Sequence, residues 1–369
     1  MTLMHKKTRP VLSNLSLPSP IQKYFSSDVW DIDLSTNTNP YLGHFAQYPD
    51  IQQVKLKEVY LDRILSLNPP PSFKKDKFSG LSSENILFTV GSMEGLDVLL
   101  RTFAEPNKDV ICIGTPTFPA YKHWALIHNL KVEEIPLSGE GLESLSIENI
   151  IKINPKMVFL CNPNNPTGTV LKPELIEKLC ESIEGLVVVD EAYIEFSTLS
   201  SSIFCLNKYN NLIILRTFSK AWGLAGVRCG VIISNKAVIH ALRHVQLPFG
   251  FSSFSQKKVR ERLFDMEETV LSWKRITQNR DDLMANLLKL KAITKIFKSH
   301  TNFIMMLLKD FQEAMTLLKR HKILVLDCSA SLPNSIRVSL GSEEQNMKFL
   351  AVMQEASLSL QETKRLMLV

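Results

Sequence analysis

From about residue 50 to residue 250, short apolar segments alternate with stretches that have helical spacing, and polar residues directly follow several of the apolar segments. Apolar runs of this length are typical of strands buried on both faces of a mostly parallel sheet, with helices between them. Ligands of such sheets bind at the carboxyl ends of the strands. The pattern therefore predicts an α/β domain whose functional residues lie just after its strands.

Two of the predicted strands end in residues that could hold an aromatic ring. The segment 186–189 is followed by Asp190 and then by Tyr193, and a carboxylate at this place could pair with a protonated ring nitrogen. The segment 157–161 is followed by a loop, 162–168, that two prolines stiffen and a glycine ends. An asparagine in such a loop could donate a hydrogen bond to a ring hydroxyl. Ordinary turns and strand ends use the same residue types, so neither segment alone indicates a ring-binding site. The interpretation depends on finding them together with the other segments.

A lysine with a suitable neighbourhood follows a further apolar segment. Lys220 comes one residue after Ser219 and three after Thr217, and Arg228 follows it by eight. Small residues between them would let a bulky anion approach the backbone. A second anion site is predicted at Gly91, where an apolar segment leads into the amino end of a helical pattern. An imine-forming lysine beside a phosphate site is what pyridoxal phosphate (PLP) chemistry requires.

In this order, the segments resemble those of fold-type I PLP-dependent aminotransferases, and within them the histidinol-phosphate aminotransferase group, from about residue 30 to residue 345. The resemblance implies an α/β fold in which a large domain with a mostly parallel sheet is joined to a smaller α+β domain. It implies that Lys220 is the Schiff-base lysine and proton carrier. It also implies that Asp190 binds the pyridine nitrogen, that Asn165 and Tyr193 hold the ring oxygen, that Phe118 stacks on the ring, and that Ser92, Met93, Thr217, Ser219 and Arg228 hold the phosphate.

Three further segments resemble the family on its substrate side. Arg337, in the segment 335–339, resembles the arginine that clamps a substrate α-carboxylate. Asn37 and Asn39 lie in a segment that resembles the family's asparagine-rich stretch over the substrate. Tyr48 resembles the tyrosine that reaches the cofactor phosphate of the neighbouring subunit. The last likeness implies an obligate homodimer with shared active sites.

The tract before the substrate-clamping arginine departs from the family. A further arginine, which binds the distal phosphate of the substrate, is usual there, whereas this chain has Leu326 followed by Asp327. A leucine cannot hold a phosphate, and an aspartate repels one. Candidate replacement cations are Arg243, His244 and Lys122, each of which could equally be a solvated surface residue.

The predicted organisation has three parts: an N-terminal arm (1–45) that joins the small domain, a large PLP-binding domain (46–255), and linker helices with a small C-terminal domain (256–369). The net charge of +6 is modest, and no basic and aromatic pattern typical of nucleic-acid binding accompanies it. The six cysteines are dispersed without metal-ligand spacing and are expected to be reduced thiols. No apolar leader or membrane-length run is present, so a soluble cytoplasmic protein without a metal is expected.

Three functions stay open from the sequence. The first is transamination from histidinol phosphate to 2-oxoglutarate, giving imidazole acetol phosphate and glutamate; an aromatic or other apolar amino donor is the rival, since Leu326 makes that wall more apolar. The second is a decarboxylase similar to threonine-phosphate decarboxylase, which also needs a phosphate-binding arginine. The third, a catalytically silent protein of the same fold, is disfavoured because every PLP-contacting position carries a competent residue type.

Overall fold

The computed structural model describes residues 7–14, 21, 31–67, 69–70 and 80–366. Its larger part is built on a sheet in the order β1-β8-β7-β6-β5-β2-β3-β4. The central strands β7, β6, β5, β2 and β3 are parallel, whereas β8 runs antiparallel to β1 and β7, and β4 runs antiparallel to β3. The strands are β1 (Ile86–Thr89), β2 (Val110–Thr115), β3 (Lys131–Ser138), β4 (Ser144–Leu145), β5 (Met157–Cys161), β6 (Leu186–Asp190), β7 (Leu212–Thr217) and β8 (Gly230–Ser234). The predicted mostly parallel sheet is confirmed.

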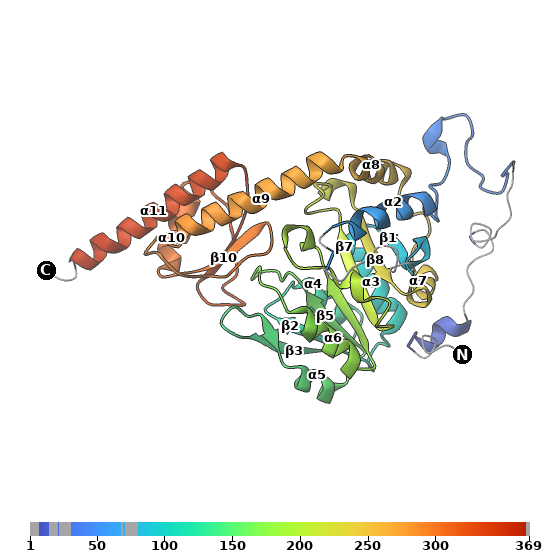
Figure 1. Cartoon of the computed structure of the whole chain (residues 1–369), viewed down its shortest axis with the longest axis horizontal. Helices are drawn as coiled ribbons and strands as arrows, with labels where there is room; N and C mark the ends of the chain where they lie inside the picture. The colour runs from blue at the N-terminus through green and yellow to red at the C-terminus, as the bar shows by residue number, and fades with distance from the viewer. Residues whose placement is uncertain (1–6, 15–20, 22–30, 68, 71–79, 367–369) are drawn as a thin grey trace.

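Both faces of this sheet are buried, which explains the continuous apolar runs. In β6, Val187 and Val189 belong to one apolar core, while Val188 between them belongs to the core on the opposite face. The first core is covered by α2 (Val54–Leu65), α5 (Ile147–Ile153), α6 (Pro173–Ser182) and α8 (Ser253–Phe264), and the second by α3 (Gly91–Phe103), α4 (Ala120–Ile127) and α7 (Lys236–Arg243). Helices lie on both sides of the sheet in Figure 1, which leaves the ends of the strands as the place for polar functional side chains.

The smaller part is a four-stranded antiparallel sheet in the order β11-β12-β10-β9, with its own apolar core. Its strands are β9 (Ile293–Ile296), β10 (Phe303–Leu308), β11 (Leu326–Asp327) and β12 (Ser335–Ser339), and its helices are α10 (Phe311–Arg320) and α11 (Glu343–Leu366). The long helix α9 (Met266–Leu287) leads into it from the large sheet (Figure 1). An α+β part after the large sheet was predicted, and the boundaries at residues 46 and 256 stay predictions.

The described residues of the N-terminal arm contact the large sheet's helices. The amide of Arg9 donates to Thr102 O at 2.9 Å, at the end of α3, and Lys7 Nζ donates to Glu184 O at 2.5 Å. Through these bonds, residues 7–14 contact the large domain within this chain. The expectation that the arm joins the small domain stays a prediction.

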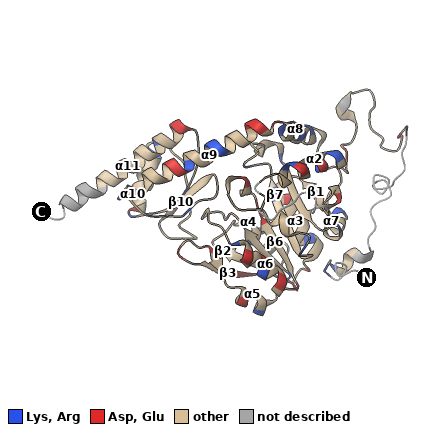
Figure 2. Ribbon diagram, in the orientation of Figure 1, with Lys and Arg blue, Asp and Glu red and all other residues tan. Residues whose placement is uncertain are grey.

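Charges of both signs are interspersed along α9, as Figure 2 shows. Among the described residues, no helix is both long enough and apolar enough to cross a membrane, and no cluster of potential metal ligands is found there.

Candidate active site

The predicted Schiff-base lysine and the predicted ring-binding carboxylate follow neighbouring parallel strands. Asp190 ends β6, and Lys220 comes three residues after the end of β7, whose Leu215 is paired with Asp190. Lys220 Nζ lies 5.9 Å from the ring centroid of Tyr193. Burial and the charge of Arg337 lower the pKa of Lys220, while Asp190 opposes this shift. A lowered pKa favours the neutral amine, which is the nucleophilic form.

The carboxylate of Asp190 is buried and held from two sides. Ala192 N donates to its Oδ1 at 3.1 Å, and Tyr121 Oη donates to its Oδ2 at 2.7 Å. Burial raises the pKa of Asp190 to about 6, although the hydrogen bonds from Tyr121 and Ala192 lower it. The carboxylate is therefore fixed in direction and is still ionised at neutral pH.

Of the three asparagines in the loop after β5, only Asn165 is directed at the site. The side chain of Asn162 exchanges hydrogen bonds with the backbone of Leu171, and that of Asn164 bonds to Pro116 O and Thr167 Oγ1. Asn165 Oδ1 instead accepts a hydrogen bond from Arg337 Nη1, which comes from the small domain. The choice of Asn165 among the three as the ring-binding asparagine was implied by the resemblance and stays a prediction.

Arg337 brings the small domain to this site. Its guanidinium carbon lies 4.8 Å from the ring centroid of Phe303, and Phe303 meets Tyr193 edge to face at 5.2 Å. Its Nε is buried and has no hydrogen-bond partner within the described part of the chain. In the sheet, Leu326 is the direct partner of Arg337, so the two side chains share one face. That Leu326 occupies the position of the family's phosphate-binding arginine stays a prediction.

A second group of predicted residues forms a cradle at the start of α3. A Cβ added to Gly91 (φ 73°) would lie 2.5 Å from Arg228 Nη2, and one added to Gly230 would lie 2.4 Å from Ser92 N. The approach to the backbone at Gly230 requires glycine, and the positive φ of Gly91 favours glycine there. Arg228 Nη1 also donates to Ser219 Oγ at 3.4 Å, while Thr217 Oγ1 accepts from the amide of Ser219 at 3.1 Å. A guanidinium, hydroxyls and the first amides of a helix therefore converge, which suits a phosphate.

The predicted residues of the arm do not lie at this site within the chain. Tyr48 stacks on Phe249 with ring centroids 4.4 Å apart and is half exposed. Asn39 Oδ1 accepts from the amide of Tyr41, and Asn37 has a left-handed backbone (φ 44°) in the same exposed segment. Figure 1 shows this segment beyond α2, away from β10. The role of Tyr48 in a neighbouring subunit, and the roles of Asn37 and Asn39 over the substrate, stay predictions.

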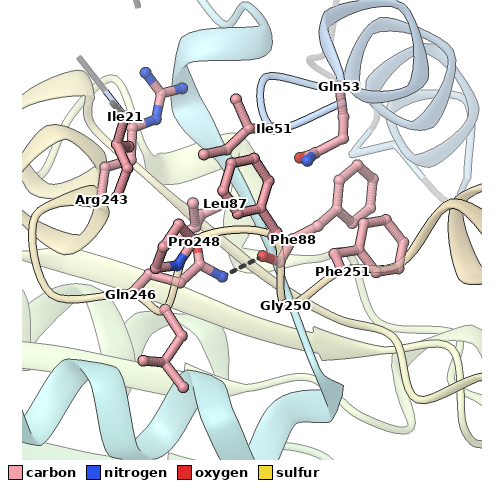
Figure 3. Close-up of a pocket in the computed structure, with 12 residues that line it drawn as sticks. Ile21, Ile51, Gln53, Leu87, Phe88, Arg243, Gln246, Pro248, Gly250 and Phe251 are labelled. Atoms are coloured by element: carbon pink, nitrogen blue, oxygen red, sulfur yellow. Dashed lines mark hydrogen bonds between the residues drawn. The ribbon is translucent and has the colours of Figure 1, made fainter. Parts of the chain in front are cut away.

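The three candidate replacement cations also have other surroundings. Lys122 Nζ pairs with Glu134 at 2.5 Å, and His244 Nδ1 lies 2.9 Å from His240 O. Arg243 lines a cavity of about 40 Å³ next to the loop 246–251, where Gln246 Nε2 donates to Phe88 O at 2.7 Å (Figure 3). The structure places none of the three beside Arg337.

Comparison with known proteins identifies the family. The model of the family "Aminotransferase class I and II" matches residues 31–353. The chain belongs to the class I and II aminotransferase family. It is 32% identical over 356 residues to histidinol-phosphate aminotransferase of Christiangramia forsetii, covering 95% of this chain and 97% of that one.

Solved structures agree on the fold of this aminotransferase. Histidinol-phosphate aminotransferase from Clostridium acetobutylicum matches with a TM-score of 0.74 and 22% identity, over 85% of this chain and 92% of that one. The Sinorhizobium meliloti enzyme, solved in complex with pyridoxal-5'-phosphate, matches with a TM-score of 0.73 and 23% identity, over 86% and 84%. The family is PLP-dependent, so this chain is a PLP-dependent aminotransferase. The unpartnered Nε of Arg337 and the glycine-lined cradle at Gly91 fit a bound cofactor and substrate.

The sequence did not reveal the buried network behind the aminotransferase site. Arg216 Nη2 pairs with Glu191 Oε2 at 2.9 Å, and Trp222 Nε1 donates to Glu195 Oε1 at 2.9 Å. These contacts tie the chain after β6 to β7 and to the segment that follows β7, and so fix Lys220 relative to Asp190. The adjacent acidic residues were visible in the sequence, but their partners come from a different strand.

Phe118 and Tyr121 form a second feature that the sequence only partly revealed. Phe118 lies edge to face on Tyr121 with centroids 5.6 Å apart, at the carboxyl end of β2. The stacking role of Phe118 stays a prediction. Tyr121, three residues later on the sheet-facing side of α4, was missed, because a buried tyrosine in a helix is ordinarily a core residue.

Proposed function

We propose that this aminotransferase moves the amino group of histidinol phosphate to 2-oxoglutarate, giving imidazole acetol phosphate and glutamate. The observation that carries the proposal is the position of Arg337, which joins Asn165 across the two domains and keeps a buried Nε without a partner. Histidinol phosphate bears a phosphorylated hydroxymethyl group on the carbon where an amino acid bears its carboxylate. One guanidinium can therefore meet the donor's phosphate and, in the second half-reaction, the α-carboxylate of 2-oxoglutarate.

The residues around Lys220 would hold PLP as follows. Asp190 pairs with the pyridine nitrogen, and Tyr193 and the amide of Asn165 donate to the ring hydroxyl, since Asn165 Oδ1 is already used by Arg337. Phe118 covers the ring. The cradle of Ser92, Met93, Thr217, Ser219 and Arg228 takes the phosphate. When bound, PLP withdraws electrons from the substrate carbon that bears the amino group.

Lys220 has two tasks in this proposal. Its Nζ anchors the cofactor covalently, and once the donor has displaced it, the same nitrogen accepts the proton from the donor carbon that bears the amino group. The lowered pKa of Lys220 suits it to both tasks, because burial and Arg337 favour the neutral amine. Asp190 keeps a negative charge on the opposite side of the ring.

Leu326 leaves a rival donor open. Its side chain shares a face with Arg337 and is 47% exposed, so the wall beside the arginine is apolar where a second cation would strengthen phosphate binding. An aromatic amino acid would use this wall and place its carboxylate on Arg337. Threonine phosphate with release of CO₂ is the decarboxylase rival.

A panel of donors separates these possibilities. Glutamate formation from 2-oxoglutarate is measured as kcat/KM with histidinol phosphate, histidinol, phenylalanine and tyrosine, and CO₂ release is measured with threonine phosphate. The proposal predicts the highest kcat/KM for histidinol phosphate. A higher value for phenylalanine or tyrosine, or CO₂ release from threonine phosphate, would replace it.

The functional unit in this proposal is a homodimer in which Tyr48 acts in the partner's site. Support comes from large apolar side chains that the single chain exposes between residues 31 and 48: Leu34 at 91%, Tyr41 at 91% and Leu42 at 77%. Free thiols at all six cysteines suit a cytoplasmic location.

Subunit mixing tests the shared site. Lys220→Ala and Tyr48→Ala subunits are exchanged and the activity of the mixture is compared with that of each parent. If Tyr48 acts in trans, each heterodimer contains one site with both native residues, so activity rises above both parents. Confirmed exchange without any rise would place Tyr48 in its own subunit's site or outside both sites.

A further inference from the structure

Tyr121 makes a hydrogen bond that reaches the carboxylate of Asp190 from a different layer of the fold. Tyr121 lies in α4, on one face of the sheet, whereas Asp190 ends β6. The phenol Oη donates to Asp190 Oδ2 at 2.7 Å, and the tyrosine side chain is only 1% exposed. A buried hydroxyl needs a partner, and a carboxylate is the strongest acceptor available to it.

Packing contacts hold the ring of Tyr121 with its hydroxyl pointing toward Asp190. It stacks on Phe159 of β5 with centroids 5.5 Å apart and planes at 14°. On another side it meets Phe118 edge to face, at 5.6 Å and 87°. These contacts connect the residue predicted to cover the cofactor ring with the residue predicted to bind its nitrogen.

Among the groups around Asp190 that lower its pKa, Tyr121 has the largest effect. Burial raises the pKa of Asp190, and Glu191 raises it further, whereas Tyr121, the amide of Ala192 and Lys220 lower it. Burial and the neighbouring Asp190 raise the pKa of Tyr121 itself, so the phenol stays a neutral donor.

Two other titratable groups face this carboxylate. Burial, and then the charge of Asp190, raise the pKa of Cys161 on β5, so its thiol is neutral at ordinary pH. Burial likewise raises the pKa of Tyr193 after β6, and Asp190 adds to that shift. Neither group competes with Tyr121 for the role of a charge-stabilising donor to Asp190.

We infer that Tyr121 is a positioning residue which holds Asp190 ionised and correctly directed, and so sets both the affinity for PLP and the lowest pH at which PLP binds. The inference rests on the role proposed above for Asp190. It adds a residue that acts on the cofactor only through another side chain. The backbone amide of Ala192 fixes one carboxylate oxygen, and Tyr121 fixes the other.

The test measures the dissociation constant of PLP from the apoenzyme between pH 5 and pH 9, which does not depend on turnover. Tyr121→Phe keeps the ring contacts with Phe159 and Phe118 and removes only the hydroxyl. It is expected to weaken PLP binding roughly tenfold at neutral pH. The pH below which affinity falls should move upward, because Asp190 then takes up its proton more readily.

Tyr209→Phe is the matched control. Tyr209 Oη also donates to carboxylates, Glu177 at 2.9 Å and Glu181 at 2.7 Å, but these residues lie on α6, away from the site. This variant removes an equivalent tyrosine–carboxylate hydrogen bond and should leave PLP affinity and its pH dependence unchanged.

A double-mutant cycle with Asp190→Asn separates positioning from packing. If Tyr121 acts through the charge of Asp190, Tyr121→Phe has no further effect on PLP affinity in the Asp190→Asn background. An equal loss in both backgrounds would assign Tyr121 a packing role and overturn the inference. Unchanged affinity in Asp190→Asn alone would overturn the role of Asp190 instead, whereas a loss in Asp190→Asn with none in Tyr121→Phe would overturn only the inference about Tyr121.

Discussion

The cofactor end and the substrate end of the site are built differently. Asp190, Thr217 and Asn165 at the cofactor end are 6%, 4% and 8% exposed, and a strand or a proline-stiffened loop fixes each of them. At the substrate end, Leu326 is 47% exposed on β11, an edge strand of only two residues. In the proposed function the chemistry therefore lies on the sheet strands, and donor choice lies on an edge strand that can change without disturbing them.

Changes at the two ends should therefore differ in kind. A cofactor-end change should lower activity with every donor by a similar factor. A substrate-end change should alter the ratio between phosphorylated and unphosphorylated donors and leave PLP affinity intact.

Lys220→Ala should have the largest effect. It removes both the covalent anchor and the proton acceptor, so kcat should fall at least roughly a thousandfold with all donors. Circular dichroism and thermal unfolding should stay close to those of the native chain, because the side chain is exposed to the site. Residual activity above a tenth of the native value would assign the chemistry to another residue.

Asp190→Asn should lower kcat/KM roughly a hundredfold, since a neutral amide cannot pair with a ring cation.

The native apoenzyme should lose stability as pH rises from about 4 to 6. The pKa of Asp190 is about 6 in the folded chain, against an ordinary value of 3.8. Between these two pH values the folded chain keeps the proton on Asp190 while the unfolded chain has released it, so folding becomes less favourable as pH rises. The variant should lack this slope in thermal unfolding. An identical slope in both proteins would show that another group is responsible.

Arg337→Lys is the corresponding change at the substrate end. A lysine keeps the charge but loses the fork that could bind phosphate or carboxylate through two nitrogens. We expect kcat/KM to fall about tenfold to a hundredfold for histidinol phosphate and for 2-oxoglutarate, with PLP affinity unchanged. A large fall in PLP affinity would place Arg337 in the cofactor end.

The same contrast decided what the sequence could predict. Asp190 ends its strand, and Asn165 and Lys220 follow theirs within a few residues, so local patterns and a family resemblance were enough to predict them as site residues. The partners of these residues could not be predicted in this way. Tyr121 reaches Asp190 across 69 positions of the chain, and Arg337 reaches Asn165 across 172.

The surroundings of the arm and of the candidate cations were also beyond local patterns. The bond from the amide of Arg9 to the end of α3 uses backbone groups that any sequence has, so no residue pattern could predict it. Lys122 on α4 was a candidate to bind the phosphate of the substrate, but its side chain pairs with Glu134 on β3. Pairings between distant residues depend on the assembled fold rather than on residue spacing.

Leu326→Arg should change activity least of these variants. It should change the preference for phosphorylated over unphosphorylated donors and leave the cofactor end unaffected. The new guanidinium would lie on the same face as Arg337, and at a half-exposed position solvent limits its gain to roughly tenfold in the kcat/KM ratio of histidinol phosphate to histidinol. Leu326→Gln controls for polarity without charge. If the native enzyme already prefers histidinol phosphate by roughly a thousandfold or more, a cation other than one at position 326 binds the phosphate.

The identity of the lysine that binds PLP tests the account most directly, because Lys220 shares its lowered pKa with other lysines, among them a fully buried one. Lys57 on α2 is 1% exposed, and burial, followed by the charge of Arg243, lowers its pKa to about 7. Borohydride reduction of the holoenzyme followed by peptide mass spectrometry locates the lysine that carries the pyridoxyl group. We predict the label on Lys220 and none on Lys57. A label on Lys57, or on any lysine other than Lys220, would contradict the assignment of the site.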